Sequence, residues 1–453
     1  MSRGTSRMVN MTEGSIWRHM VNFAVPVLLG NLFQQFYNTF DSIVVGRFAG
    51  KDALAAVASS GNLIFMMNAF FIGLTMGAGV IISRWFGGGD DEKVEAAIHT
   101  DVAFGFVCGL LLTVIGMGFT PQILIWMRTP ADVLPLSTLY FRIFFAGSLA
   151  SVLYNTFTGI MRAIGDSRTP LIYLIVASVT NIVLDLLFVG AFSMGVAGAA
   201  VATVISQLLS AILCAIRLMK MEGACRLVPR RVRFDMGQLK LITNQGIPAG
   251  LQNSIIAIAN VVVQSNINTF GNDVMAGQGA YAKVEGFVFL PITAFSMALT
   301  TFIGQNLGAG KYERAKQGAR FGVISAMLLA EGIGVVIYLI APHAIALFND
   351  DPDVIAVGAR AAHTEAFFYC ALAMAHAVSA IMRGIGKAKI PMYTMLGCWC
   401  LLRVAYITVM LRYFRNVVVI FSAYPLTWLC SCVIFLICYL RIDWEKAARP
   451  LDY

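Results

Sequence analysis

The sequence has little charge: only 13% of its 453 residues are Asp, Glu, Lys or Arg, whereas 58% are hydrophobic. Its mean hydropathy of +0.76 lies outside the range of ordinary globular domains. A soluble fold is therefore excluded, and we expect an integral membrane protein. The first eighteen residues lack the short apolar core and small-residue cleavage site of a signal peptide, so we interpret them as a tail.

Histidine is scarce, with five residues, and the nine cysteines are scattered through apolar segments. Cys398 and Cys400, like Cys430 and Cys432, are two positions apart, which turns their side chains to nearly opposite sides of a helix. Neither a disulfide framework nor a zinc-site spacing is present. We also find no set of nucleophile, histidine and acid, so we expect neither an enzyme nor a cofactor other than a coupling ion.

Long apolar runs are abundant instead, and many exceed the roughly 20 residues that a helix needs to cross a bilayer. We place twelve transmembrane helices in them, so the predicted fold class is an all-α membrane protein. The predicted spans are 19–46, 53–83, 94–119, 135–161, 169–192, 196–222, 239–270, 276–305, 315–341, 354–383, 390–411 and 417–441.

Lysine and arginine are unevenly distributed between these spans. With the amino-terminal tail in the cytoplasm, 24 of them fall on cytoplasmic segments and five on outer segments. The positive-inside rule thus places both termini in the cytoplasm. An anionic membrane face next to the basic loops explains the net charge of +9, so we expect no nucleic-acid partner.

The chain contains an internal repeat. GIMRAIGDSRTP at 159–170 matches AIMRGIGKAKIP at 380–391 after 221 positions, and WFGGG at 85–89 meets NLGAG at 306–310 at the same offset. Because each copy holds six helices, an even number, both copies begin on the same side of the membrane and the repeat is parallel. Such a duplication favours a transporter over a receptor or a membrane enzyme.

The repeat also predicts the domain organisation. A polar, basic stretch between the copies is expected to be a linker that lets two lobes move. The predicted parts are a cytoplasmic tail at 1–18, an N-lobe at 19–222, a basic cytoplasmic linker at 223–238, a C-lobe at 239–441 and a cytoplasmic tail at 442–453.

The first predicted span carries a polar stripe on an otherwise apolar helix. The stripe contains Asn31, Gln34, Asn38 and Asp41 at spacings of three and four, with Tyr37 at its border. A charged Asp at the bilayer centre costs about 2.5–3.5 kcal/mol on insertion scales, so such residues normally face a bundle interior or a water-filled pathway. The stripe therefore indicates a functional site.

The fifth and sixth predicted spans supply partners at a similar depth. Asp41 and Asp185 each lie about six residues below the outer end of their helices, Asn181 is one turn from Asp185, and Thr203 reaches the same level. Two carboxylates in a low dielectric repel each other until a proton, or a Na⁺ with oxygen ligands, removes the repulsion. The spacing predicts a cation-exchange site. The alternative is that Asn181 and Asp185 only hydrogen-bond neighbouring helices.

The second lobe does not repeat these acids, because Val263 stands at the position of Asp41 and Tyr406 at that of Asp185. Structural roles are the favoured interpretation for its ionisable residues inside predicted spans. The residues considered are Lys283, Glu285, Glu331, His376 and Arg403.

Together these features resemble the multidrug and toxic compound extrusion (MATE) family over about residues 15–440. The similarity rests on the stripe from Pro26 to Arg47, on GGGD and GAGK, on the paired MRAIGDSRTP and MRGIGKAKIP, and on NIVLD in the fifth span. It implies two lobes that alternate between outward- and inward-facing states and export amphipathic, often cationic drugs in exchange for H⁺ or Na⁺. A departure is that the seventh span has no acid before Asp273, so the chain is closer to the DinF-like or MepA-like branch than to NorM.

The resemblance also implies roles for single residues. The implied ion-coupling residues are Asp41, Asn181, Asp185 and Thr203, which would also hold Na⁺ if that is the coupling ion, together with Tyr37. The predicted substrate contacts are Gln34, Asn38, Met66, Tyr140 and Asn155. We expect a monomer in a bacterial plasma membrane whose partners are small amphipathic or cationic molecules and the bilayer.

The nearest alternative function is a lipid-linked saccharide flippase, since the related superfamily includes such proteins. A flippase is expected to line its cavity with several Arg or Lys side chains that hold a pyrophosphate. The polar stripe of the first span contains none.

Overall fold

A computed structural model describes residues 9–126 and 133–449 of the chain. Every regular element in these ranges is a helix, which confirms the predicted all-α class. The chain divides into two compact units. Unit 1 consists mainly of Leu29–Thr243, and unit 2 joins Met11–Leu28 to the chain from Asn244 onward.

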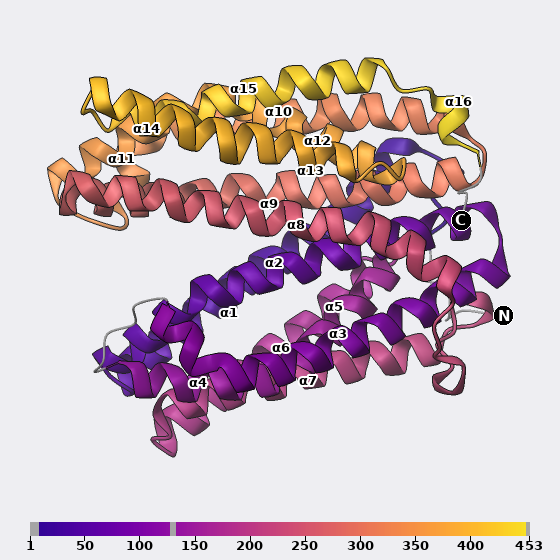
Figure 1. The fold of residues 1–453 in the computed structure, drawn as a ribbon, viewed down its shortest axis with the longest axis horizontal. Helices are drawn as coiled ribbons and strands as arrows, with labels where there is room; N and C mark the ends of the chain where they lie inside the picture. The colour runs from indigo at the N-terminus through magenta and orange to yellow at the C-terminus, as the bar shows by residue number, and fades with distance from the viewer. Residues whose placement is uncertain (1–8, 127–132, 450–453) are drawn as a thin grey trace. The chain divides into compact units, whose positions relative to one another are not determined.

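Unit 1 is a bundle of helices (Figure 1). In chain order it contains the second half of α1 (Ile16–Phe48), α2 (Lys51–Gly88), α3 (Asp91–Trp126), α4 (Leu134–Ala146), α5 (Ser148–Ala163), α6 (Arg168–Asp185), the π-helix η1 (Leu186–Ala191), α7 (Gly195–Met219), the 3-10 helices η2 (Gly223–Cys225) and η3 (Pro229–Arg231), and the start of α8 (Met236–Ile267).

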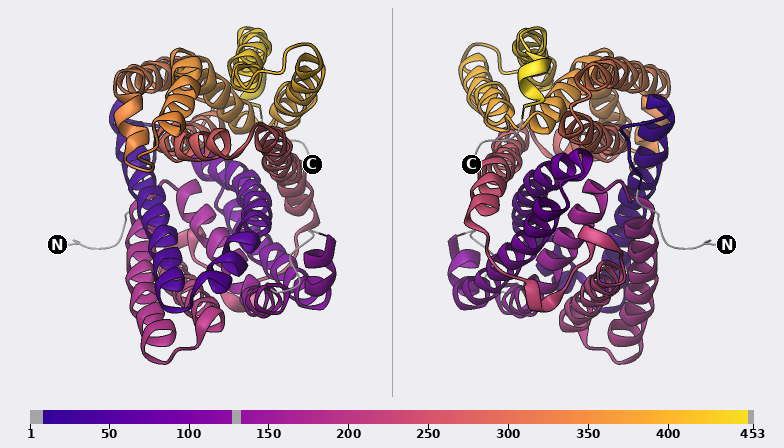
Figure 2. Two further views of the ribbon diagram at one scale, coloured as in Figure 1. Left: turned by 90° about the vertical axis from the view of Figure 1, so that its left-hand side faces the viewer. Right: turned by 90° about the vertical axis from the view of Figure 1, so that its right-hand side faces the viewer.

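Unit 2 is a second helical bundle, which Figure 2 shows nearly along several of its helix axes. It contains the first half of α1, the rest of α8, the 3-10 helix η4 (Asn268–Phe270), α9 (Asn272–Gly308), α10 (Tyr312–Ala346), α11 (Pro352–Glu365), the 3-10 helix η5 (Ala366–Phe368), α12 (Tyr369–Gly384), α13 (Lys389–Met395), the π-helix η6 (Leu396–Leu402), α14 (Arg403–Tyr413), α15 (Val418–Leu440) and α16 (Trp444–Ala447).

The predicted membrane spans all fall on helices. Within the described residues, ten helical segments are long and apolar enough to cross a membrane, or eleven if α4 and α5, which meet at 47°, form one span. Helix α1 is not among them although its 33 residues are long enough, because its polar stripe lowers its hydropathy. Helices are expected here because they satisfy their own backbone hydrogen bonds, which lipid cannot do.

The two units share one packing pattern. In unit 1, α5 is the central helix and packs against α2, α3 and α7. In unit 2, α12 packs in the same way against α9, α10 and α15. These helices occupy corresponding positions in the two copies of the sequence repeat, so the repeat extends to the tertiary packing.

The repeat is also visible in the way four helices end. Gly89, Gly165, Gly310 and Gly386 all have positive φ, between 69° and 91°. After each glycine, the next backbone N–H donates to the carbonyl five residues earlier, as from Asp90 to Trp85 and from Lys311 to Asn306. This is the Schellman arrangement, in which glycine avoids the Cβ penalty of the left-handed region. The GGGD and GAGK turns are therefore helix ends.

The segment before α1 is docked on unit 2. The Met11 N–H donates to Gln305 Oε1 at 2.9 Å, and Arg314 Nη2 donates to the carbonyls of Met11 and Glu13 at 3.1 and 3.0 Å. Further along, Met20 and Phe23 are buried in the core of unit 2. The prediction assigned 1–18 to a tail and 19–28 to the N-lobe, whereas Met11–Leu28 packs with the second half of the chain.

The linker at 223–238 is docked on α3 of unit 1 rather than extended. The Val228 N–H donates to His99 Nε2 at 3.0 Å, the Asp235 N–H donates to Thr100 Oγ1 at 3.0 Å, and Arg231 pairs with Glu95 at 2.6 Å. These contacts hold both the backbone and a charged side chain of the linker. The linker is therefore a packed part of unit 1.

Candidate functional site

The predicted acidic pair lies inside unit 1, where three helices meet. Asp41 comes from the second half of α1, and Asp185 is the last residue of α6, directly before the π-helix η1. Asp185 is fully buried and Asp41 is 9% exposed. A π-helical turn within a long helix is rare and is frequently found at functional sites.

The two carboxyl groups meet side chain to side chain. Asp41 and Asp185 lie within hydrogen-bonding reach of each other, and one oxygen of each, Oδ1, is buried without another partner. A hydrogen bond between two carboxyl groups requires one proton, because an ionised carboxylate can only accept. The geometry therefore suits a pair that shares a proton or holds a small cation.

Amide and hydroxyl groups complete the cluster. With its amide oriented to form both bonds, the Asn181 NH₂ donates to Asp185 Oδ2 at 2.7 Å and its oxygen accepts from the Thr203 N–H at 3.2 Å. The Tyr37 hydroxyl donates to Thr203 Oγ1 at 3.5 Å. The structure thus brings together all five predicted ion-coupling residues, from α1, α6 and α7.

Tyr140 also lies at this cluster. It is 5% exposed on α4, within electrostatic range of Asp41, Asp185 and Tyr37. Tyr140 was predicted as a substrate contact, and its side chain lies beside the two acids. Its position was not evident from the sequence because no spacing relates α4 to α1 and α6.

The other predicted substrate residues do not gather at one point in the described part of the chain. Gln34 and Asn38 have exposed side chains on α1. Asn155 is half-buried and donates to the Ser151 carbonyl of its own helix at 2.9 Å. Met66 belongs to a stretch of α2 whose side chains lie outside the described residues.

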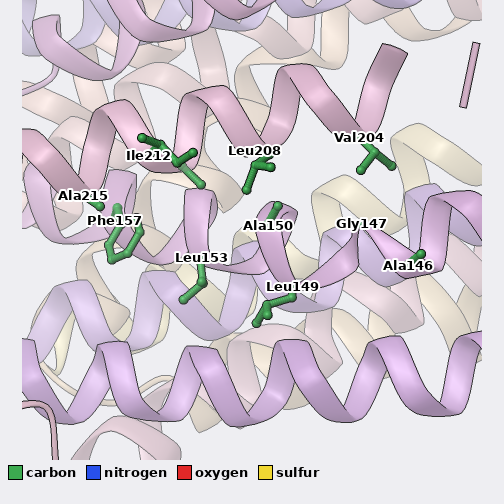
Figure 3. A pocket seen from close by; sticks show the side chains of 11 residues that line it. Ala146, Gly147, Leu149, Ala150, Leu153, Phe157, Val204, Leu208, Ile212 and Ala215 are labelled. Atoms are coloured by element: carbon green, nitrogen blue, oxygen red, sulfur yellow. The ribbon is translucent and has the colours of Figure 1, made fainter. Parts of the chain in front are cut away.

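A cavity of about 350 Å³ lies elsewhere in unit 1, between α7 and the α4–α5 pair (Figure 3). Its lining is apolar and includes Leu149, Leu153, Phe157, Leu208 and Ile212. None of the predicted site residues lines it. The cavity therefore has no part in the ion chemistry of the acidic pair.

Unit 2 contains an acidic cluster of which Glu285 was a candidate from the sequence and Glu365 was not. Glu365 is fully buried at the end of α11, where its Oε2 accepts from the Tyr281 hydroxyl at 3.0 Å, and that hydroxyl lies 2.7 Å from the Tyr369 hydroxyl. Glu285 on α9 and Arg403 lie within electrostatic range of Glu365. Glu365 stands as an isolated acid within the apolar span 354–383, which is the signal that could have identified it.

The remaining ionisable candidates of the second lobe contact neighbouring helices or loops. Glu331 Oε2 accepts from the Cys370 N–H at 3.0 Å, in the first turn of α12. Lys283 lies over the Phe348 ring at 5.3 Å, and the His376 ring packs edge to face against Phe289 and Trp399. Among the described residues, no group of three or more His, Cys, Asp or Glu side chains has a metal-binding arrangement.

Sequence comparison extends these observations to known proteins. The MatE family model matches residues 26–187 and 248–409, one segment in each half of the chain. The chain is 31% identical to the probable multidrug resistance protein YoeA of Bacillus subtilis (strain 168) over 387 residues, which cover 84% of each protein. It is 24% identical to the multidrug export protein MepA of Staphylococcus aureus (strain MSSA476), covering 76% of each protein.

Solved structures share the fold. A crystal structure of MATE in complex with MaL6 superposes with a TM-score of 0.90 at 23% identity, covering 98% of this chain and all of the other. An outward-facing multidrug resistance MATE transporter of the MOP superfamily gives the same TM-score. The two matched segments confirm the predicted two-lobe repeat. The chain belongs to the MATE family and is a multi-pass membrane transporter, not an enzyme.

Proposed function

We propose that this transporter is a cation-coupled antiporter that exports amphipathic, often cationic small molecules across a bacterial plasma membrane, with both termini in the cytoplasm. The observation that carries the proposal is the buried pair of Asp41 and Asp185. Its relatives named as multidrug resistance and multidrug export proteins support the substrate class.

The Asp41–Asp185 pair requires a mobile cation because no cationic side chain in the part of the chain that the structure describes compensates its negative charge. Among the described residues, the groups that act electrostatically on Asp41 and Asp185 do not include Lys or Arg. Two carboxylates cannot both remain ionised at low cost in a poorly hydrated site. Cation binding and release therefore change the charge of the cluster, and each charge state favours a different arrangement of α1, α6 and α7.

The proton fits this geometry better than Na⁺ does. The Asn181 oxygen already accepts from the Thr203 N–H, which leaves one of its two lone pairs for a metal ion. The carboxyl groups are close enough to share a hydrogen bond, which a proton satisfies directly. Na⁺ would require further oxygen ligands from water or substrate.

The proposal is tested by cationic-dye transport in proteoliposomes under an imposed pH gradient or an imposed Na⁺ gradient. We expect the pH gradient to drive transport by the wild type, and Asp41→Asn or Asp185→Asn to reduce it to the level without a gradient. Asp101→Asn is the matched control, because Asp101 is a buried acid of the same unit outside the cluster.

Two results would contradict the proposal. If both variants retain gradient-driven transport, the pair has no coupling role. If the wild type moves a lipid-linked saccharide and no dye, the protein is a flippase.

A further inference from the structure

Arg403 is a buried cation at membrane depth in unit 2. Its side chain is 2% exposed, and it begins α14 directly after the π-helix η6. Nε and Nη2 donate to Thr427 Oγ1 at 3.3 and 3.0 Å, and Nη1 donates to Asn260 Oδ1 at 3.4 Å. The guanidinium also lies over the Tyr424 ring at 4.3 Å. These contacts fix its position but supply no negative charge.

The negative charge near Arg403 comes from Glu285 and Glu365. The guanidinium acts electrostatically on both carboxyl groups, and they act on each other. Oε1 of each glutamate is buried without a hydrogen-bond partner. Three tyrosines also lie within electrostatic range of the pair: Tyr281, Tyr369 and Tyr424.

A guanidinium remains protonated in proteins, so its burial in a low dielectric is costly unless a counter-charge lies nearby. With one glutamate ionised and the other protonated, the guanidinium and the pair together are neutral. A mobile cation bound in addition would leave the cluster with excess positive charge, because the guanidinium already compensates the ionised glutamate. The pair in unit 1 differs, because no Lys or Arg is among the described groups acting on Asp41 and Asp185.

We infer that Arg403 is the resident counter-ion of the Glu285–Glu365 pair and thereby confines exchange of a mobile cation to the Asp41–Asp185 pair. This inference rests on the proposed function only for the exchange in unit 1. In unit 2 the buried guanidinium and the two acids are sufficient for the charge balance.

Irregular helical segments adjoin both Glu365 and Arg403, which supports a functional role for this cluster. The 3-10 segment Ala366–Phe368 follows Glu365, and the π-helix Leu396–Leu402 precedes Arg403. Short 3-10 and π segments within long helices often mark functional positions, because they rotate the following side chains relative to a regular helix. Here they flank the two oppositely charged members of the cluster.

The test counts bound cations in purified full-length protein in which Asp41→Asn and Asp185→Asn remove the pair of unit 1. Radioactive Na⁺ is the probe at mildly alkaline pH, and infrared spectroscopy counts protonated carboxyl groups. We expect this parent to bind no Na⁺. Adding Arg403→Met should create one site, occupied by one Na⁺ or one extra proton per molecule, and adding Glu365→Gln should remove it again. Arg403→Lys should behave like the parent.

Two outcomes overturn the inference: Na⁺ binding by the parent that Glu365→Gln abolishes, or no gain of Na⁺ or protons in Arg403→Met. If Arg403→Met is too unstable for binding studies, thermal unfolding decides. Arg403→Met should then lower the melting temperature and Glu365→Gln should restore it, and a further loss would contradict the charge balance. Failure of dye transport in the wild type would refute the proposed function without changing these results.

Discussion

The acids within the predicted spans of this protein differ in which groups hydrogen-bond to them; Asp185 and Glu365 are buried, and Glu331 is half-buried. Asp185 accepts from an amide and meets another carboxyl group, Glu365 accepts from a tyrosine hydroxyl, and Glu331 accepts from a backbone N–H. A backbone N–H group is neutral and fixed in place, so it requires a hydrogen-bond acceptor but no change in the charge of that acceptor. Of these acids, Glu331 is therefore the one with a purely structural explanation.

Substitutions of Glu331 test whether its role is structural. The Cys370 N–H belongs to the first turn of α12, where N–H groups have no partner within their own helix. Glu331→Leu should leave it unsatisfied and cost about 1–3 kcal/mol of stability, whereas Glu331→Gln retains an acceptor and should stay near the wild type. Thermal unfolding measures the difference. Loss of gradient-driven dye transport in Glu331→Gln would show instead that the charge itself is required.

At the scale of elements, the linker is the least expected part of the structure. Cys225 in η2 is 4% exposed, and burial raises the pKa of its thiol to about 11. The thiolate is the reactive form of cysteine, so a buried, protonated thiol reacts slowly with alkylating reagents. Cys225 thus reports whether the linker is docked.

Alkylation of Cys225 at neutral pH should be slow in the wild type and several-fold faster in Thr100→Val, which loses the acceptor of the Asp235 N–H. Thr113→Val is the matched control, since Thr113 lies on the same helix and, among the described residues, donates to the Gly109 carbonyl of its own helix. Peptide mass spectrometry separates Cys225 from the other eight cysteines. Equal rates in all three proteins would show that Thr100 does not hold the linker.

At the scale of the whole molecule, the halves of the sequence are not the packed units. Residues Met11–Leu28 belong with the second half, and α8 begins with the first half up to Thr243. Pro26 and Pro248, which correspond in the repeat, lie within five residues of these two crossing points. Each half therefore depends on a segment that the other half supplies.

This dependence predicts the behaviour of a split protein. A fragment from Gly223 to the carboxyl terminus lacks Met20, Phe23 and Val27, which fill the core of unit 2. We expect it to be aggregated or degraded when produced alone, and to become monodisperse when the fragment 1–222 is co-expressed. Size-exclusion chromatography in detergent distinguishes the two states. A monodisperse second fragment without its partner would contradict the role of α1 in unit 2.

Much of the fold follows from local properties of the sequence. Apolar run length predicts the spans because a bilayer has a fixed thickness, and the repeated glycines predict matching helix ends because a left-handed turn favours a residue without Cβ. The polar stripe on α1 predicts a site inside the protein, because exposing a carboxylate to lipid costs free energy. The depth of Asp41, Asp185 and Thr203 in their helices, and the spacing of Asn181 from Asp185, therefore predicted that these side chains lie at one level of unit 1.

The sequence by itself determined which segments are helices, that they form two related sets of six, and which side chains are too polar for lipid. Only the tertiary structure decided which of those side chains meet. Tyr140 joins Asp41, Glu365 joins Arg403, and Met11–Leu28 joins unit 2 through contacts between residues far apart in the chain. Helical periodicity acts over a few residues, whereas these contacts depend on how whole helices pack.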